Sequence, residues 1–174
     1  MDRRMTREEL EKAIIDLMDS NTTITLSCSL DDWPWAAAVY YARRGFDLIF
    51  FSSQQSRHSQ IFARNPRTAG TIHGEYSRWE DIKGLQIEGT VEPISSALDV
   101  ARATATYLKK YPFVSRFFTD TDGMSAVLAS KVARVALYVL RCQSIRYVNN
   151  SEGFGSRWKL VIKDGLPVGN PVRD

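Results

Sequence analysis

The residues best suited to chemistry lie together in the first third of the chain, where an apolar segment ends and a polar turn follows. They are Ser52, Ser53, Ser56, Arg57 and His58. The serine at the turn is placed to cap a helix, so hydroxyls, a guanidinium, free backbone N–H groups and the positive end of a helix dipole converge. Such a place suits an anion, most simply a phosphate. A capped surface helix with solvated cations would carry the same residues, and both interpretations stay open.

Other chemistries find less support in the sequence. Histidine occurs only at His58 and His73 and cysteine only at Cys28 and Cys142, without the paired spacing of a metal site. The segment 153–156 lacks both the nucleophile elbow of a serine hydrolase and the third glycine of a nucleotide-binding loop. We therefore expect no bound metal, and the serine-rich turn is the strongest candidate for a functional site.

The elements around this turn can be predicted from apolar patterning. A strand at Phe46–Ser52 leads into it, and a helix from Ser56 ends before Pro66. Two strands of a hairpin, Thr22–Ser29 and Ala36–Ala42, precede it. The hairpin's small residues Ala36, Ala37 and Ala38 leave room for a flat ligand or another backbone, although close helix packing would explain them equally well.

The remaining elements complete a mainly β pattern. A capping box at Thr6 begins a helix that ends near Asp19, and two further helices are expected at residues 96–111 and 113–118. Further strands are expected at 68–72, 84–93, in two pieces within 132–148, and at 158–163. The predicted elements show no βαβ alternation, so they favour an antiparallel barrel of about six strands with marginal helices (α+β). We expect residues 1–174 to form this single domain. Residues 1–20 form its N-terminal helix, and residues 164–174 are expected to be a loose tail.

Composition narrows the function classes. The 174 residues are 44% hydrophobic and 25% charged, and a net charge of +3 with evenly spread cations does not indicate nucleic-acid binding. Cysteines within apolar runs indicate buried thiols and a reducing compartment. A charged N-terminus and the lack of a membrane-length apolar run lead us to expect a cytoplasmic protein with no membrane partner.

The order and spacing of several short motifs resemble a known family. They are Trp35–Ala42, Phe50-Phe51-Ser52-Ser53, Ser56-Arg57-His58, Asn65-Pro66 and Gln86-Ile87-Glu88-Gly89. Together they resemble the pyridoxamine 5'-phosphate oxidase-like, flavin-binding split-barrel superfamily. The likeness is best over Trp33–Pro93, and the segment Tyr147–Ile162 resembles a bacterial branch, the YhbP-like proteins.

The resemblance implies a split barrel that binds FMN in a cleft between two subunits. The phosphate would be held by Ser52, Ser56 and Arg57, with His58 in place of the family's lysine. Ala36, Tyr41 and Gly84 replace an arginine, a lysine and a glutamine that contact the flavin in the oxidases, and Gln86 is a substitute for the glutamine. The full cofactor-binding set expected is Ser52, Ser53, Ser56, Arg57, His58, Ala36, Ala37, Ala38, Val39, Phe51, Gln86 and Trp158.

The implied activity is that of a flavin-dependent oxidoreductase, a reductase or oxidase, acting on an unknown small molecule. It is not a pyridoxamine phosphate oxidase, because the substrate-holding Arg-x-His segment is missing and no histidine follows His73. FAD, a deazaflavin or haem are alternative cofactors, a non-enzymatic carrier of a planar ligand is an alternative function, and a barrel without ligand is a third.

Two further expectations concern the assembly and the C-terminal region. Apolar strand surfaces at Val135–Leu140 and Leu85–Val91 exceed what a small barrel needs, which with the resemblance indicates a homodimer. Trp158 and the loop before it would lie near the flavin cleft, or else Trp158 belongs to the core, and both alternatives stay open.

Overall fold

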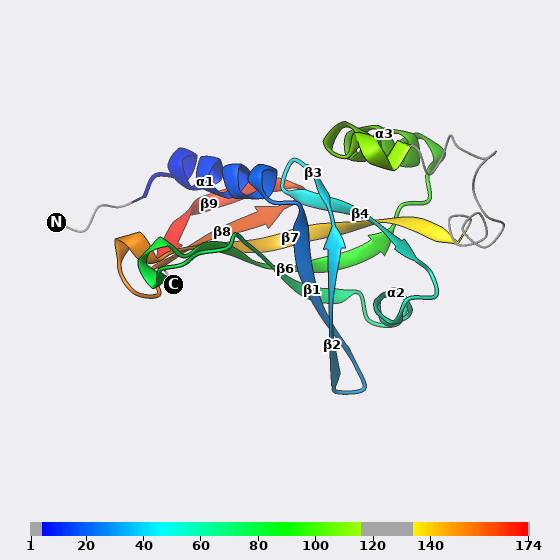
Figure 1. Cartoon of the computed structure of the whole chain (residues 1–174), viewed down its shortest axis with the longest axis horizontal. Coiled ribbons are helices and arrows are strands. Elements are labelled where there is room, and N and C mark those ends of the chain that lie inside the picture. The colour runs from blue at the N-terminus through cyan, green and yellow to red at the C-terminus, as the bar shows by residue number, and fades with distance from the viewer. Residues whose placement is uncertain (1–4, 116–133, 174) are drawn as a thin grey trace.

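The chain folds into one antiparallel sheet that curls into a half-barrel, with helices along its margins (Figure 1). The computed structural model describes residues 5–115 and 134–173. Within them the sheet has nine strands, and its main path runs β2-β1-β5-β6-β7-β4-β3, with β8 added to β7 and β9 to β8. No helix in these two ranges is long and apolar enough to cross a bilayer.

The strands are bounded as follows: β1 Thr23–Leu30, β2 Trp33–Tyr40, β3 Ala42–Arg44, β4 Asp47–Ser53, β5 Arg67–His73, β6 Lys83–Pro93, β7 Val135–Asn149, β8 Arg157–Lys163 and β9 Leu166–Arg173. The helices are α1 Arg7–Ser20, α2 Arg57–Phe62 and α3 Ala97–Lys110, with 3₁₀ turns η1 Trp79–Asp81, η2 Pro112–Ser115 and η3 Asn150–Glu152. This confirms the expected mainly β split barrel. The last residues of the expected 113–118 helix lie outside the described residues.

The strand count is higher than the six expected, and two strands form where none was expected. The segment expected as a turn at Arg43-Arg44 forms the short strand β3, paired with β4. The two strand pieces expected within 132–148 are one strand, β7, which continues through its polar residues by a bulge opposite Glu88 and Gly89. Gly89 permits this close approach, because a Cβ there would lie 2.1 Å from the Arg141 carbonyl oxygen.

The second added strand lies where a loose tail was expected. β9 pairs with β8 through a tight turn at Asp164 and Gly165, whose φ angles are 53° and 75°. Asp-Gly is a dipeptide suited to this left-handed turn, since glycine and aspartate tolerate positive φ. The expectation of a loose tail after Lys163 was therefore wrong for residues 166–173.

Two apolar clusters hold the fold together. The larger fills the inner side of the half-barrel with strand residues and with Leu10, Ile14 and Met18 of α1, which begins with the expected capping box at Thr6. The smaller lies where α3 packs on the opposite face of β3, β4 and β7. The strand surfaces that prompted the dimer expectation, Leu85–Val91 and Val135–Leu140, are thus largely buried within one chain, so they do not call for a partner.

The end of α3 is tied to the start of the sheet by buried polar contacts. The Tyr111 hydroxyl is 2.6 Å from the Tyr41 carbonyl oxygen and 2.8 Å from that of Thr22. Lys110 donates to the carbonyl oxygens of Met18 and Asn21 at the end of α1. These contacts fix α1 and α3 relative to the β2–β3 corner.

Candidate functional site

A cluster of serine hydroxyls lies where β4 ends and α2 begins. Ser56 Oγ donates to Ser59 Oγ at 2.8 Å, and Ser59 Oγ donates to Ser52 Oγ at 3.2 Å. Ser52 Oγ is also 3.1 Å from Ser56 Oγ and 2.6 Å from His58 Nε2. Every hydroxyl of the cluster has an acceptor when Ser52 donates its proton to an unprotonated Nε2 of His58. Three of the expected site residues, Ser52, Ser56 and His58, are therefore brought together.

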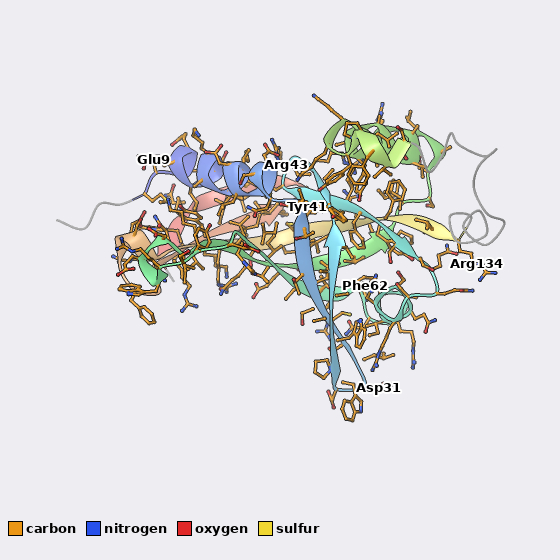
Figure 2. The ribbon with its side chains drawn as sticks, in the orientation of Figure 1. Glu9, Asp31, Tyr41, Arg43, Phe62 and Arg134 are labelled. Atoms are coloured by element: carbon orange, nitrogen blue, oxygen red, sulfur yellow. The ribbon has the colours of Figure 1, made fainter. Side chains whose placement is uncertain are left out.

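Local sequence explains the geometry of this turn. Ser56 is the N-cap of α2, with φ −65° and ψ 148°, and its Oγ accepts the N–H of Ser59 at 3.3 Å. The first backbone hydrogen bond of the helix runs from the Gln60 N–H to the Ser56 carbonyl oxygen. The N–H groups of Arg57 and His58 come before this bond, so they have no acceptor within the helix. Buried Ile61 and Phe62 hold the short helix on the sheet, and Figure 2 labels Phe62 on this helix.

Ser59 is a member of the cluster that the sequence analysis missed. It is 3% exposed, and its hydroxyl bridges Ser56 and Ser52. Its position could have indicated this role, because Ser59 lies three residues after the N-cap, where a side chain turns back toward the capping residue. A polar side chain with this burial keeps its hydroxyl satisfied only through the other members of the cluster.

His58, in the first turn of α2, is half-buried. Its ring lies 5.9 Å from that of Phe62, and Nε2 meets Ser52. Burial lowers the pKa of His58, because removing water disfavours the charged imidazolium. His58 is therefore a neutral hydrogen-bonding partner for Ser52 in the absence of a nearby anion.

The Arg57 side chain reaches the β1–β2 hairpin. Its guanidinium lies 4.6 Å from the centre of the Trp35 ring. Among the described residues, no carboxylate forms an ion pair with it. Its charge is exposed within one turn of helix of the serine cluster, where it remains available to an anion.

The other expected site residues divide between the two faces of the sheet, as the strand period of two requires. On β4, Ser52 shares the inner face with Phe50, whereas Phe51 lies on the other face, against Tyr107 of α3. Ser53, one residue further, accepts the N–H of Gln55 at 3.2 Å. The structure therefore separates Phe51 and Ser53 from the serine cluster.

The same alternation divides β2, which forms one edge of the sheet path. Val39 faces the core and Ala37 is half-buried on the same face, whereas Ala36 and Ala38 are exposed on the outer face. Close helix packing, one of the two explanations considered for the alanines, therefore does not account for Ala36 or Ala38 within the described chain.

The outer face of the sheet carries a row of exposed or half-buried side chains, most of them small, across β2, β1, β5 and β6. Register places Ala38 beside Thr25, Thr25 beside Thr71, and Thr71 beside Gln86. Gln86 is exposed, while its neighbours Leu85 and Ile87 are in the core. Gln86, Ala36 and Ala38 thus share a face of one chain that is not the face of Ser52.

Trp158 lies in the main core, which is the alternative that the sequence left open. It is 6% exposed on β8, and its Nε1 donates to Glu152 Oε2 at 3.2 Å. The loop before it exposes Phe154, whose ring packs 5.7 Å from Trp79. The two cysteines are free, buried thiols, as expected, and burial raises the pKa of both.

Comparisons with known proteins agree with this fold. The family model described as pyridoxamine 5'-phosphate oxidase matches residues 10–138. A UPF0306 protein of Haemophilus ducreyi is 26% identical over 147 residues, which cover 81% of this chain and 87% of that protein.

Two solved structures share the fold at low identity. A haem-binding protein from Mycobacterium smegmatis superposes with a TM-score of 0.66 at 19% identity, over 87% of this chain, and this chain spans 57% of that protein's length. An FAD-binding protein from Mesorhizobium loti superposes with a TM-score of 0.60 at 17% identity, over 82% of this chain and 94% of that one.

The half-barrel with a hydroxyl-rich turn between β4 and α2 is thus a pyridoxamine 5'-phosphate oxidase-like split barrel. Because the family model matches well over half of the chain, the chain belongs to the pyridoxamine 5'-phosphate oxidase family.

Proposed function

We propose that this chain binds FMN and that the turn between β4 and α2 holds its phosphate. The observation that carries the proposal is the hydroxyl cluster of Ser52, Ser56 and Ser59 beside His58, in a chain of this family. Arg57 and the free N–H groups at the start of α2 add charge and donors.

The residues present fit a phosphate. The hydroxyls can each turn a donor toward an incoming oxygen, and Arg57 has no carboxylate among the described residues to compete with the anion. His58 would take up a proton as the anion approaches, because a nearby negative charge favours the imidazolium. Replacement of the family's lysine by His58 would make phosphate binding dependent on pH near neutrality.

When bound, FMN supplies the chemistry of hydride transfer. Ser52, Ser56, Ser59 and Arg57 would hold its phosphate. The chain would act as an oxidoreductase on a small molecule other than pyridoxamine phosphate, because it has no histidine after His73 to form the substrate-holding Arg-x-His segment. Cys28 and Cys142 remain thiols, which suits work in the cytoplasm.

We further propose a two-fold symmetric dimer in which the outer face of one chain meets the other. The supporting observation is that Gln86, Ala36 and Ala38 face away from Ser52 in one chain, so a second copy is needed to gather the expected set around one ligand. Light scattering at micromolar concentration should give twice the mass of the chain, and a monomer would contradict this proposal.

A carrier of haem is the second candidate, supported by the fold likeness to the haem-binding protein of M. smegmatis. A visible absorption spectrum of the freshly purified protein separates the candidates. Flavin bands, or their appearance after incubation with FMN and removal of the excess, support the first proposal. A Soret band supports the second, and a bare spectrum that persists after incubation with FMN contradicts FMN binding.

A further inference from the structure

A groove lies beside the proposed phosphate site, between α2 and the tip of the β1–β2 hairpin. It has a volume of about 330 Å³, and its lining includes Asp31, Trp33, Arg57, Gln60 and Arg64. The hairpin projects beyond the rest of the sheet in Figure 1, and Figure 2 labels Asp31 at its tip. The volume falls in the range of small-molecule sites, roughly 300–1,000 Å³.

The helix side of the groove is cationic. Arg57, Gln60 and Arg64 are spaced by three and four residues, so they follow one face of α2 and its C-terminal end. Arg64, like Arg57, is exposed and pairs with no carboxylate among residues 5–115 and 134–173. Two guanidinium groups against the single carboxylate of Asp31 leave the groove with a net positive charge suited to a phosphate.

The hairpin side of the groove is aromatic. Trp33 and Trp35 lie on one face of β2, because they are two residues apart. Arg57 covers Trp35, whereas Trp33 is 71% exposed and lines the groove. An exposed indole beside two guanidinium groups favours a ligand that joins a planar ring to a phosphate.

We propose that this groove binds the adenylate half of FAD. The proposal rests on the proposed function, since Arg57 borders both the phosphate site and the groove. FAD is FMN extended by adenylate through that phosphate, so a flavin held at the serine cluster directs its second phosphate along α2. Arg64 binds that phosphate, adenine stacks on Trp33, and Asp31 accepts from the ribose hydroxyls.

Titration of the full chain with FAD, FMN and AMP tests the proposal. We expect FAD to bind at least about tenfold more tightly than FMN, the value of one added charged hydrogen bond or stacked ring. Trp33→Ala and Arg64→Ala should each weaken FAD and AMP binding about tenfold and leave FMN binding unchanged. The matched controls are Trp79→Ala and Arg102→Ala, which change an exposed tryptophan and an exposed arginine of η1 and α3.

The outcomes separate this inference from the proposed function. If FMN binds but FAD binds no better, or if FAD binding ignores both groove variants, the groove is not an adenylate site and the proposal is overturned. If neither flavin binds, AMP still tests the groove alone, and no AMP binding overturns it. If Trp33→Ala splits a dimer without changing FAD affinity, a second copy covers Trp33, which also overturns it.

Discussion

Replacing Ser52 by alanine removes the centre of the hydroxyl cluster, and the structure allows the cost to be worked out. Ser52 Oγ contacts Ser56 Oγ, His58 Nε2 and Ser59 Oγ at 3.1, 2.6 and 3.2 Å. In the variant Ser56 still donates to Ser59, whereas His58 Nε2 loses its donor and the Ser59 hydroxyl loses its acceptor. Leaving one such group unsatisfied costs about 1–3 kcal/mol.

Urea unfolding followed by circular dichroism measures this cost. With a loss of about 2 kcal/mol and a slope of about 2 kcal/mol per molar urea, the midpoint of Ser52→Ala should fall by about 1 M. Ser53→Ala is the matched control, because the Ser53 hydroxyl accepts the N–H of Gln55 and makes no other hydrogen bond within the described part of the chain. Its effect should stay within about 0.5 kcal/mol. Equal midpoints for the two variants would refute the reasoning that the cluster stabilises this turn.

Two further predictions concern α3 and His58. Tyr111→Phe should lower the free energy of unfolding by about 1–3 kcal/mol, because the Tyr41 carbonyl loses its buried donor. The control is Tyr40→Phe, which changes a half-exposed ring and should alter the free energy of unfolding by under about 0.5 kcal/mol. Equal effects of the two variants in urea unfolding would show that the Tyr111 hydroxyl adds nothing to stability. Burial lowers the pKa of His58 in the folded chain, so the unfolded chain binds a proton at this histidine more readily than the folded chain does. The free energy of unfolding should therefore fall as the pH drops below about 6.5, the pKa of an unperturbed histidine, toward the lower pKa of the folded chain. His58→Gln should remove that part of the pH dependence and His73→Gln should keep it, and a His58→Gln profile identical to that of the parent would contradict the assignment.

Much of the scaffold could be predicted because its signals are local. The capping box at Thr6, the N-cap at Ser56 and the apolar period of two in β6 each depend on a few neighbouring residues. The Asp164-Gly165 turn is equally local. β9 was missed because Pro167, Gly169 and Pro171 interrupt the strand pattern of the tail. The continuity of β7 was hidden because a bulge absorbs its polar residues.

The site itself was predicted only in part, since it depends on contacts between distant segments. The alternation of side chains along a strand is enough to predict that Ser52 and Ser53 lie on opposite faces of the sheet. The position of Arg57 over Trp35, in contrast, depends on the β1–β2 hairpin reaching α2, which is a contact between distant segments. Whether Trp158 lines a cleft or fills the core depends on how β8 adds to β7, which no local pattern specifies. The role of Ser59 follows from its burial against the sheet, not from its own residue type.

Equilibrium titration of the parent chain and Arg57→Ala with FMN and riboflavin tests most directly whether the turn between β4 and α2 binds the flavin phosphate. A charge-assisted hydrogen bond is worth roughly 1.5–3 kcal/mol, so Arg57→Ala should weaken FMN binding about tenfold to a hundredfold. Riboflavin lacks the phosphate and should bind both proteins almost equally. Equal FMN affinity in the two proteins, or FMN binding no better than riboflavin in the parent, would contradict the assignment of this site.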